Sequence, residues 1–216
     1  MMPKIDYHIH SEFSRCSEDT TIEGIISVAE AKGLERIAVT DHGYAERLPW
    51  FREYLSRMEK ARKSTCIDVL TGLEATIEPA GNLAVDHSIL DDLDVVIAGL
   101  HSLPESSRIE DYVEIQVKAL ETNDFHILAH PTDLLNQNTP KNLSDPIVRK
   151  LKEHSIATEM NYHHRCPSPV FIRDCVKAGI RLAPSSDAHR LDEIGHFEWF
   201  EKLITGIDQE ISWIEI

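Results

Sequence analysis

Short runs of Ile, Val and Leu recur along the chain, and most of them end in a histidine or a carboxylate. Apolar runs of this length are typical of strands that are buried on both faces of a parallel sheet. We predict strands at residues 4–10, 36–42, 66–74, 94–101, 126–130, 156–161 and 180–185, with a further short strand at 211–216. Polar residues that repeatedly end such strands are placed as in the active site of a β/α barrel.

The segments between these runs have helical periodicity. Apolar residues recur at helical spacing from Ile22 to Ala29, and Gly33 predicts the end of this helix. The pattern Thr20-x-x-Glu23 predicts a capping box at its start. Further helices are predicted at 48–63, at 110–122, from the cap Ser144-Asp145 before Pro146 to about 153, from the cap Ser168 before Pro169 to Gly179, and at 192–204.

Strand-like and helix-like segments alternate without a repeat, a linker or a low-complexity tract. This alternation predicts one α/β domain over residues 1–216 with a mostly parallel sheet. Seven or eight strand-helix units in 216 residues favour a small barrel with short connections.

Composition indicates a cytoplasmic protein without a membrane partner. Hydrophobic residues make up 42% of the chain and charged residues 27%, as in ordinary globular proteins. No apolar run approaches the roughly 20 residues of a membrane span, and the first residues lack an apolar leader segment. The four cysteines form no CxxC pair and no disulfide-like spacing, which fits a reducing compartment.

The net charge of −15 argues against a broad groove for long nucleic acid, because such grooves depend on clustered Lys and Arg. Bound divalent cations would invert the local field at a site, so the charge does not disfavour a small phosphorylated substrate. The sequence carries no signal of oligomeric state.

The polar residues at the strand ends are mostly imidazoles and carboxylates, which suit Zn²⁺, Fe²⁺ or Mn²⁺. Residues two apart on a strand point to one face, and two pairs have this spacing. A carboxylate can bridge neighbouring ions, which an imidazole cannot. The candidate ligands are His8, His10, His42, Glu74, His101, His130, Asp187 and His189.

A single histidine at a strand end is more often a hydrogen-bonded structural residue than a ligand. Placement at six strand ends makes the set as a whole favour a metal centre. The other histidines, His87, His126, His154 and His196, lie in predicted loops, at a strand start or on helices, and we interpret them as surface or packing residues.

These motifs resemble those of the PHP (polymerase and histidinol phosphatase) family, from about residue 6 to residue 189. The resemblance rests on His8-x-His10-Ser11-x-x-Ser14, Thr40-Asp41-His42-Gly43, Gly-x-Glu74, His101, Ala-His130-Pro131, Glu159-x-Asn161 and Ser-Asp187-Ala-His189. It implies a distorted seven-stranded β/α (TIM-like) barrel with two or three metal ions. By motif position, one ion would be held by His8, His10, Glu74 and Asp187, a second by Glu74, His101 and His130, and a third by His42 and His189.

The chain departs from the family pattern at one position. Where the third ion usually has another His or Asp, this sequence has Arg15-Cys16-Ser17. Cys16 could supply a thiolate, which would favour zinc, or it could be an inert small residue. Asp19 is a further possible substitute.

The resemblance and the ligand set together predict a metal-dependent phosphoesterase in which a metal-bridging hydroxide attacks a phosphate ester. We expect Glu74, Asp187 and His189 to be catalytic, and Arg165, Arg190 and His163 to bind the substrate. His163 or the neighbouring His164 could also protonate the leaving alkoxide. The expected substrate is a small phosphomonoester, as for histidinol phosphatases.

Three alternatives stay open. The first is a nucleotide or oligonucleotide phosphodiesterase, which uses the same chemistry. The second is an amidohydrolase-type reaction, although no lysine ends a strand here and Glu74 occupies the bridging role. The third is a non-catalytic PHP module, for which degenerate ligands would be expected.

Overall fold

The computed structural model describes residues 2–45, 47–135 and 141–216. Its seven strands form one parallel sheet in which each strand pairs with the next along the chain. The strands are β1 (Ile5–Ile9), β2 (Arg36–Gly43), β3 (Asp68–Thr76), β4 (Val95–Gly99), β5 (Ile127–Leu128), β6 (Ala157–Asn161) and β7 (Leu182–Ser185).

Backbone hydrogen bonds bring the two edge strands together. Asp187 N–H donates to the carbonyl of His8 at 2.8 Å, and His10 N–H donates to the carbonyl of Ala188 at 3.0 Å. At the opposite end, the Tyr7 hydroxyl donates to the carbonyl of Ile214. The sheet is therefore a nearly closed barrel, which confirms the predicted fold class.

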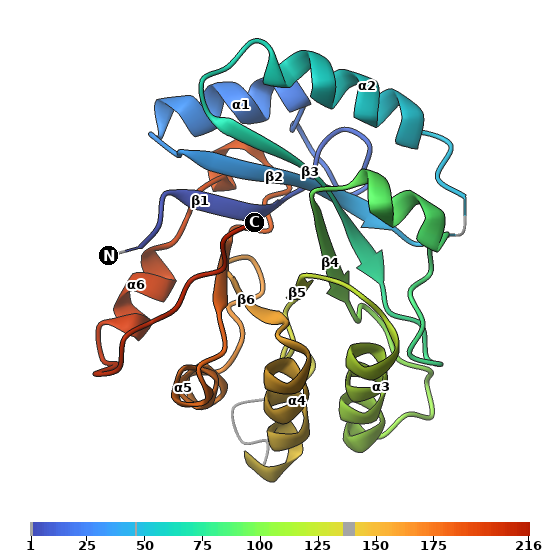
Figure 1. Cartoon of the computed structure of the whole chain (residues 1–216), viewed down its shortest axis with the longest axis vertical. Helices are drawn as coiled ribbons and strands as arrows, with labels where there is room; N and C mark the ends of the chain where they lie inside the picture. Colours follow the sequence, from blue (N-terminus) through green and yellow to red (C-terminus); the bar gives the residue numbers. More distant parts are fainter. Residues whose placement is uncertain (1, 46, 136–140) are drawn as a thin grey trace.

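Helices cover the outside of the barrel, with α1 and α2 over β1 to β3 and with α3, α4 and α5 on the opposite side (Figure 1). The helices are α1 (Ile22–Ala31), α2 (Phe51–Arg62), α3 (Ile109–Thr122), α4 (Lys141–His154), α5 (Pro169–Ala178) and α6 (Glu198–Ile204), with 3-10 turns η1 (His87–Asp92) and η2 (Leu191–Glu193). No helix in the described ranges is long and apolar enough to cross a membrane.

The start and end of α5 follow the sequence signals. The Ser168 side chain accepts a hydrogen bond from Phe171 N–H, and Pro169 takes the first helical position. Gly179 ends the helix in a left-handed conformation with φ of 74°, which glycine adopts without steric cost.

The predicted capping box at Thr20 is wrong, because the cap of α1 is Thr21. The Thr21 backbone is extended, and its side chain accepts from Gly24 N–H. The Thr20 hydroxyl instead lies 2.5 Å from that of Ser17, and Glu23 pairs with Arg57 on α2. The two side chains that the local pattern assigned to the cap therefore have other partners, one three residues away in sequence and one on another helix.

The predicted start of the fourth helix at Pro146 is also wrong. Helix α4 begins at Lys141, and Pro146 lies inside it. A proline inside a helix forfeits a backbone hydrogen bond, but Ile147 and Leu151 are fully buried in the core where α4 packs against α3 and α5. The burial of this apolar face offsets the lost bond.

The last predicted helix, 192–204, is interrupted in the structure. It consists of η2 and α6, separated at Gly195, whose φ is 68°. Gly195 N–H donates to the buried carboxylate of Asp6 on β1, and this hydrogen bond fixes the break in the helix beside the barrel.

The predicted strand at 211–216 is reduced to a single bridge between Leu182 and Trp213. Helix α2 begins at Phe51, three residues later than predicted.

An apolar cluster drawn from all seven strands fills the amino-terminal half of the barrel. Its members are Tyr7, Ala38, Leu70, Val95, Ile97, Ile127, Ala129, Ala157, Ala183 and Ile214. The pairing of β1 with β2 shifts register between Asp6 and Ile9, and such a bulge re-aims side chains beside active sites. Tyr7 consequently packs in this cluster, while His8 and His10 both face the polar carboxyl-terminal half.

Candidate metal centre

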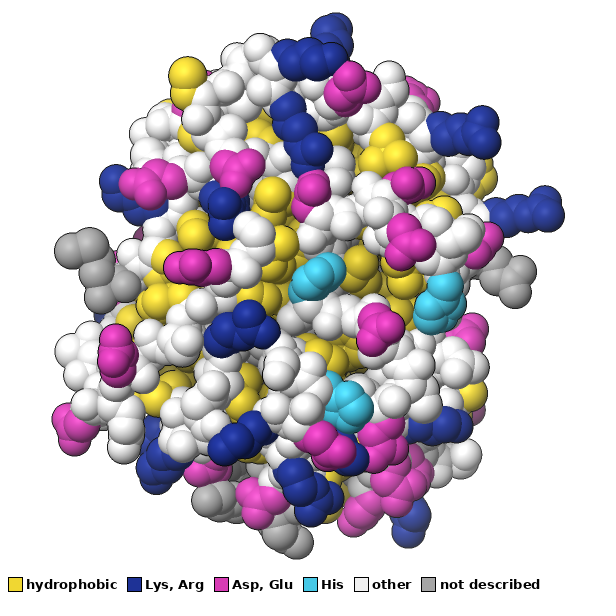
Figure 2. All heavy atoms as spheres, in the orientation of Figure 1, with side chains coloured by type: hydrophobic (Ala, Val, Ile, Leu, Met, Phe, Trp, Pro, Cys, Tyr) yellow, Lys and Arg dark blue, Asp and Glu magenta, His cyan; other side chains and the backbone are white. Residues whose placement is uncertain are grey.

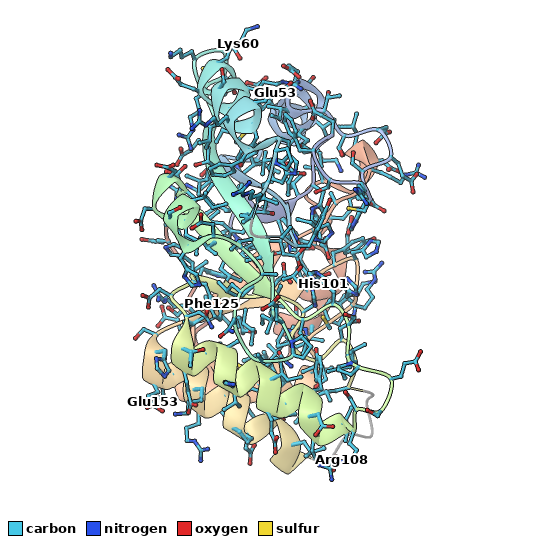
Figure 3. All side chains as sticks on the ribbon, turned by 90° about the vertical axis from the view of Figure 1, so that its right-hand side faces the viewer. Glu53, Lys60, His101, Arg108, Phe125 and Glu153 are labelled. Atoms are coloured by element: carbon cyan, nitrogen blue, oxygen red, sulfur yellow. The ribbon has the colours of Figure 1, made fainter. Side chains whose placement is uncertain are left out.

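The polar residues predicted from the strand ends converge at the carboxyl-terminal end of the barrel. Figure 3 shows this arrangement for His101, which follows β4 and lies on the side opposite Phe125, which precedes β5. His8, His10, Glu74, His130 and Asp187 are buried. Parallel strands share one carboxyl-terminal edge, so residues far apart in sequence meet there.

Glu74 lies at the centre of the cluster and is fully buried. Its Oε1 is 2.9 Å from His101 Nε2 and 3.0 Å from His130 Nε2. Its Oε2 is 2.7 Å from His42 Nδ1 and 3.4 Å from His8 Nε2. The two oxygens therefore face separate sets of imidazoles, which is the arrangement that a bridging carboxylate requires.

The close approach to Glu74 explains the glycine at the end of β4. A Cβ atom on Gly99 would lie 2.6 Å from Glu74 Oε1 and 3.1 Å from His130 Nε2. Any larger residue would displace the carboxylate or an imidazole.

Asp187, two residues after the end of β7, faces the same group. Its Oδ1 is 3.0 Å from His10 Nε2 and 3.5 Å from His8 Nε2, while its Oδ2 accepts a hydrogen bond from Asn161 Nδ2 at 2.9 Å. The backbone φ of Asp187 is 54°, a conformation that non-glycine residues rarely adopt and that recurs at functional sites.

Glu159 contacts two residues of the cluster, His8 and His130. It was not among the predicted site residues. Its Oε1 lies 2.6 Å from His8 Nδ1, and its Oε2 accepts from His130 N–H at 2.8 Å and from Asn161 Nδ2 at 2.9 Å. Burial opposes the charge on His8, but Asp187, Glu159 and Glu74 together raise its pKa well above the ordinary value. The sequence signal was present, because Glu159 and Asn161 lie two apart at the end of β6.

We expect Glu159→Gln to weaken metal binding about 10- to 100-fold, because the partner that orients a ligating histidine contributes about that much. Gln offers one oxygen where Glu159 offers two, so His8 and His130 cannot both keep their acceptors. The measurement is a competitive metal titration, with Glu153→Gln on the exposed surface of α4 as the control. Unchanged affinity in a folded Glu159→Gln variant would show that Glu159 does not position the cluster.

The residues present fit a multinuclear metal centre. In the described part of the chain, His8 Nε2 is buried without a hydrogen-bond partner. An unpaired buried polar atom is costly, and this one lies 3.4 Å from Glu74 Oε2 at the middle of the cluster. Ligand atoms of His8, His10 and Glu74, and those of His42, Glu74 and His101, lie within 4.8 Å of one another. Imidazole nitrogens and carboxylate oxygens are the ligands that Zn²⁺, Fe²⁺ and Mn²⁺ accept.

The family model of the PHP domain matches residues 6–163. The chain belongs to the PHP domain family. The match ends before Asp187 and His189, but closure of the PHP barrel brings both residues against His8 and His10.

Individual proteins agree with this assignment. A protein of Acetivibrio thermocellus named a probable phosphatase is 28% identical over 94% of this chain and 87% of its own length. The probable phosphatase YcdX of Escherichia coli is 26% identical over 96% of this chain and 87% of its own length. A structure of the Lactococcus lactis histidinol phosphate phosphatase, complexed with zinc, L-histidinol and phosphate, aligns with a TM-score of 0.69 and 17% identity over 98% of this chain and 96% of that one.

A third group of side chains in the PHP barrel includes Cys16. The ligand atoms of His10, Cys16, His42 and His189 lie within 4.8 Å of one another. Burial acts to raise the pKa of the Cys16 thiol, but the imidazoles of His189 and His42 outweigh it and lower that pKa to about 7. Asp19, the alternative candidate, instead accepts a hydrogen bond from Leu191 N–H.

The predicted substrate-binding residues of the PHP domain lie in loops at the same end of the barrel. The ring of His163 lies 4.7 Å from that of His189, and the Arg165 guanidinium lies 3.7 Å from the centre of the Tyr162 ring. The Arg190 guanidinium instead pairs with Asp192 at 3.1 Å and approaches Glu18 at 3.6 Å.

His164 lies between two carboxylates beside the cluster of predicted ligands. Its Nδ1 is 3.0 Å from Asp133 Oδ1, and its Nε2 is 3.4 Å from Asp187 Oδ2. This arrangement places a partly exposed imidazole next to a predicted ligand, and the neighbouring Asp133 was not identified from the sequence.

The remaining histidines lie apart from the predicted ligands. His87, His126 and His154 line one hollow at the amino-terminal side of the strands, and His126 Nδ1 accepts a hydrogen bond from Val96 N–H at 3.0 Å. On the face shown in Figure 2, acidic and basic side chains are interspersed, and the described residues there form no broad basic patch.

Proposed function

We propose that the protein is a metal-dependent phosphoesterase that hydrolyses a small phosphomonoester. The observation that carries the proposal is the Glu74 carboxylate, which presents one oxygen to His101 and His130 and the other to His42 and His8. Similarity to proteins named phosphatases supports the same reaction class.

The proposed ligand sets follow from these contacts. His8, His10, Glu74 and Asp187 would hold one divalent ion, and Glu74, His101 and His130 would hold a second. Cys16, His42 and His189 would hold a third. The ions would be Zn²⁺, Fe²⁺ or Mn²⁺, and when bound they supply Lewis acidity and an activated water.

Other residues of the chain would orient the metal ligands and bind the phosphate group of the substrate. Glu159 would hold the His8 ring so that Nε2 faces Glu74, and Asn161 would hold the Asp187 carboxylate. His163 and Arg165 would contact the phosphate from the loop after β6, with Arg190 in the loop after β7. The proposed catalytic roles of Glu74, Asp187 and His189 are exerted through the ions that they ligate.

We expect Arg165→Ala to raise KM for a phosphomonoester about 10-fold with a smaller change in kcat, since a hydrogen bond to a charged group contributes about 1.5–3 kcal/mol. Steady-state kinetics on p-nitrophenyl phosphate would measure this change. Arg52→Ala, on the exposed side of α2, is the matched control. A KM equal to that of the wild type would show that Arg165 does not bind the phosphate.

L-Histidinol phosphate is the proposed first substrate to examine, because the structurally similar Lactococcus lactis enzyme is described with L-histidinol and phosphate. The net charge of −15 favours such a small ester over long nucleic acid. A nucleotide or oligonucleotide diester is the second candidate, because the same ligand set can act on diesters.

The test combines metal analysis with a choice of model substrates. The purified protein is analysed for bound metal and assayed on p-nitrophenyl phosphate, bis-p-nitrophenyl phosphate and p-nitroacetanilide, with added Mn²⁺ or Zn²⁺. We expect bound metal and preferential hydrolysis of the monoester, with Glu74→Gln purified in parallel to exclude contaminating phosphatase. Preferential hydrolysis of the diester or the amide would overturn the monoester assignment, and failure to bind metal after reconstitution would overturn the function as a whole.

A further inference from the structure

The group formed by Cys16, His42 and His189, here called the thiolate group, differs in chemistry from the rest of the metal centre. It contains the one sulfur ligand among the clustered side chains of the described residues, and it contains no carboxylate. Two further groups include the Glu74 carboxylate, and a third joins His163 and His189 with Glu193. The three residues come from the loop after β1, the end of β2 and the loop after β7.

Each imidazole of the thiolate group has one nitrogen occupied elsewhere. His189 Nδ1 lies 2.9 Å from the backbone carbonyl of Asp187, and His42 Nδ1 lies 2.7 Å from Glu74 Oε2. A ligating histidine commonly donates its other ring N–H to a carboxylate or a carbonyl. These contacts leave Nε2 of both rings available to a ligand, and Cys16 is a side-chain hydrogen-bond partner of both imidazoles.

His10 does not belong to the thiolate group alone. Its Nε2 lies 3.0 Å from Asp187 Oδ1 and 3.7 Å from Glu74 Oε2, so it is shared with the neighbouring carboxylates. The thiolate group then offers one sulfur and two nitrogens. Three protein ligands with a remaining open position are typical of catalytic zinc sites.

Ligand chemistry distinguishes this group from its neighbours. Thiolate is a soft ligand that suits Zn²⁺ and disfavours Mn²⁺ and Mg²⁺, which prefer oxygen. Imidazoles with carboxylates accept Mn²⁺, Fe²⁺ and Zn²⁺ alike. We propose that Cys16, His42 and His189 form a zinc-selective site beside less selective sites built on Glu74, so that the centre can hold unlike metals. This inference rests on the metal centre of the proposed function and specifies how its metals are divided.

Cobalt spectroscopy tests the inference without an activity assay. Chelator-treated protein is titrated with Co²⁺, which occupies zinc sites and gives a near-ultraviolet thiolate-to-cobalt charge-transfer band only where sulfur is a ligand. We expect this band in the wild type and in Cys66→Ser, whose exposed cysteine is the matched control. We expect its loss in Cys16→Ser, with cobalt still bound at the other sites.

Competition then tests the selectivity. Stoichiometric Zn²⁺ should remove the charge-transfer band, whereas a large excess of Mn²⁺ should leave it. Cys16→Asp should bind Mn²⁺ more tightly than the wild type by about 10-fold or more, because a carboxylate replaces the thiolate. Cys16→Asp therefore still tests the role of Cys16 if Cys16→Ser does not fold.

The contrary outcomes separate the two proposals. Cobalt bound without a charge-transfer band would overturn the thiolate ligand but leave the metal centre. A band removed equally by Mn²⁺ and Zn²⁺ would overturn the selectivity alone. Failure of the wild type to bind cobalt at all would overturn this inference together with the proposed function.

Discussion

Replacing Glu74 with glutamine is expected to reduce kcat by about 10³-fold or more while the fold stays intact. Both oxygens of Glu74 face imidazoles of separate proposed ion sites. An amide has the same shape but only one ligating oxygen, so the variant loses the bridge and the negative charge between the ions. A factor of 10³ corresponds to about 4 kcal/mol of transition-state stabilisation, which is in the range of metal-derived electrostatic effects.

The experiment measures kcat on the best phosphate ester, bound metal per chain and the circular dichroism spectrum. Bound metal should fall in the variant, and the spectrum should match that of the wild type. Glu78→Gln is the matched control, because Glu78 follows the same strand and is exposed. Full activity with full metal content in Glu74→Gln would contradict the bridging role.

Removal of metal by a chelator is expected to abolish activity and lower Tm by on the order of 10 °C. An ion bound only by the folded state at about 1,000 times its Kd stabilises that state by about 4 kcal/mol. For a chain of this size, each kcal/mol shifts Tm by about 2–4 °C. Removal also leaves His8 Nε2 buried without a hydrogen-bond partner in the described structure.

Differential scanning calorimetry before and after chelation, and again after Zn²⁺ or Mn²⁺ is restored, would measure the shift. The Glu74→Gln variant should show a smaller shift, because it binds less metal from the outset. A wild-type Tm that is insensitive to chelation while activity disappears would separate the metal's catalytic role from its effect on stability.

The strands and the convergence of their polar ends were largely predictable. Buried parallel strands are continuous apolar runs, and their carboxyl ends must share one edge of the sheet. His42, Glu74 and His101 therefore came together from local sequence and topology alone. Asp187 joins this cluster only because the barrel closes between β1 and β7.

Other features could not be read locally. The shift of the cap from Thr20 to Thr21 depends on Ser17 and Arg57, and the break at Gly195 depends on the buried Asp6 carboxylate. The contacts of Glu23 with Arg57 and of Gly195 with Asp6 are tertiary, and they outweigh weak local preferences because cap and helix propensities amount to only about 1 kcal/mol.

The sequence by itself determined which imidazole, carboxylate and thiol groups lie at or near the strand ends, because residue type and position along a strand are properties of the chain. The tertiary structure decided which of these groups lie close together. It placed Glu159 behind His8, brought Cys16 to His42 and His189, and turned Arg190 toward Glu18 and Asp192. The physical reason is that orientation depends on contacts between residues distant in sequence, and only the closed barrel brings those residues within bonding distance.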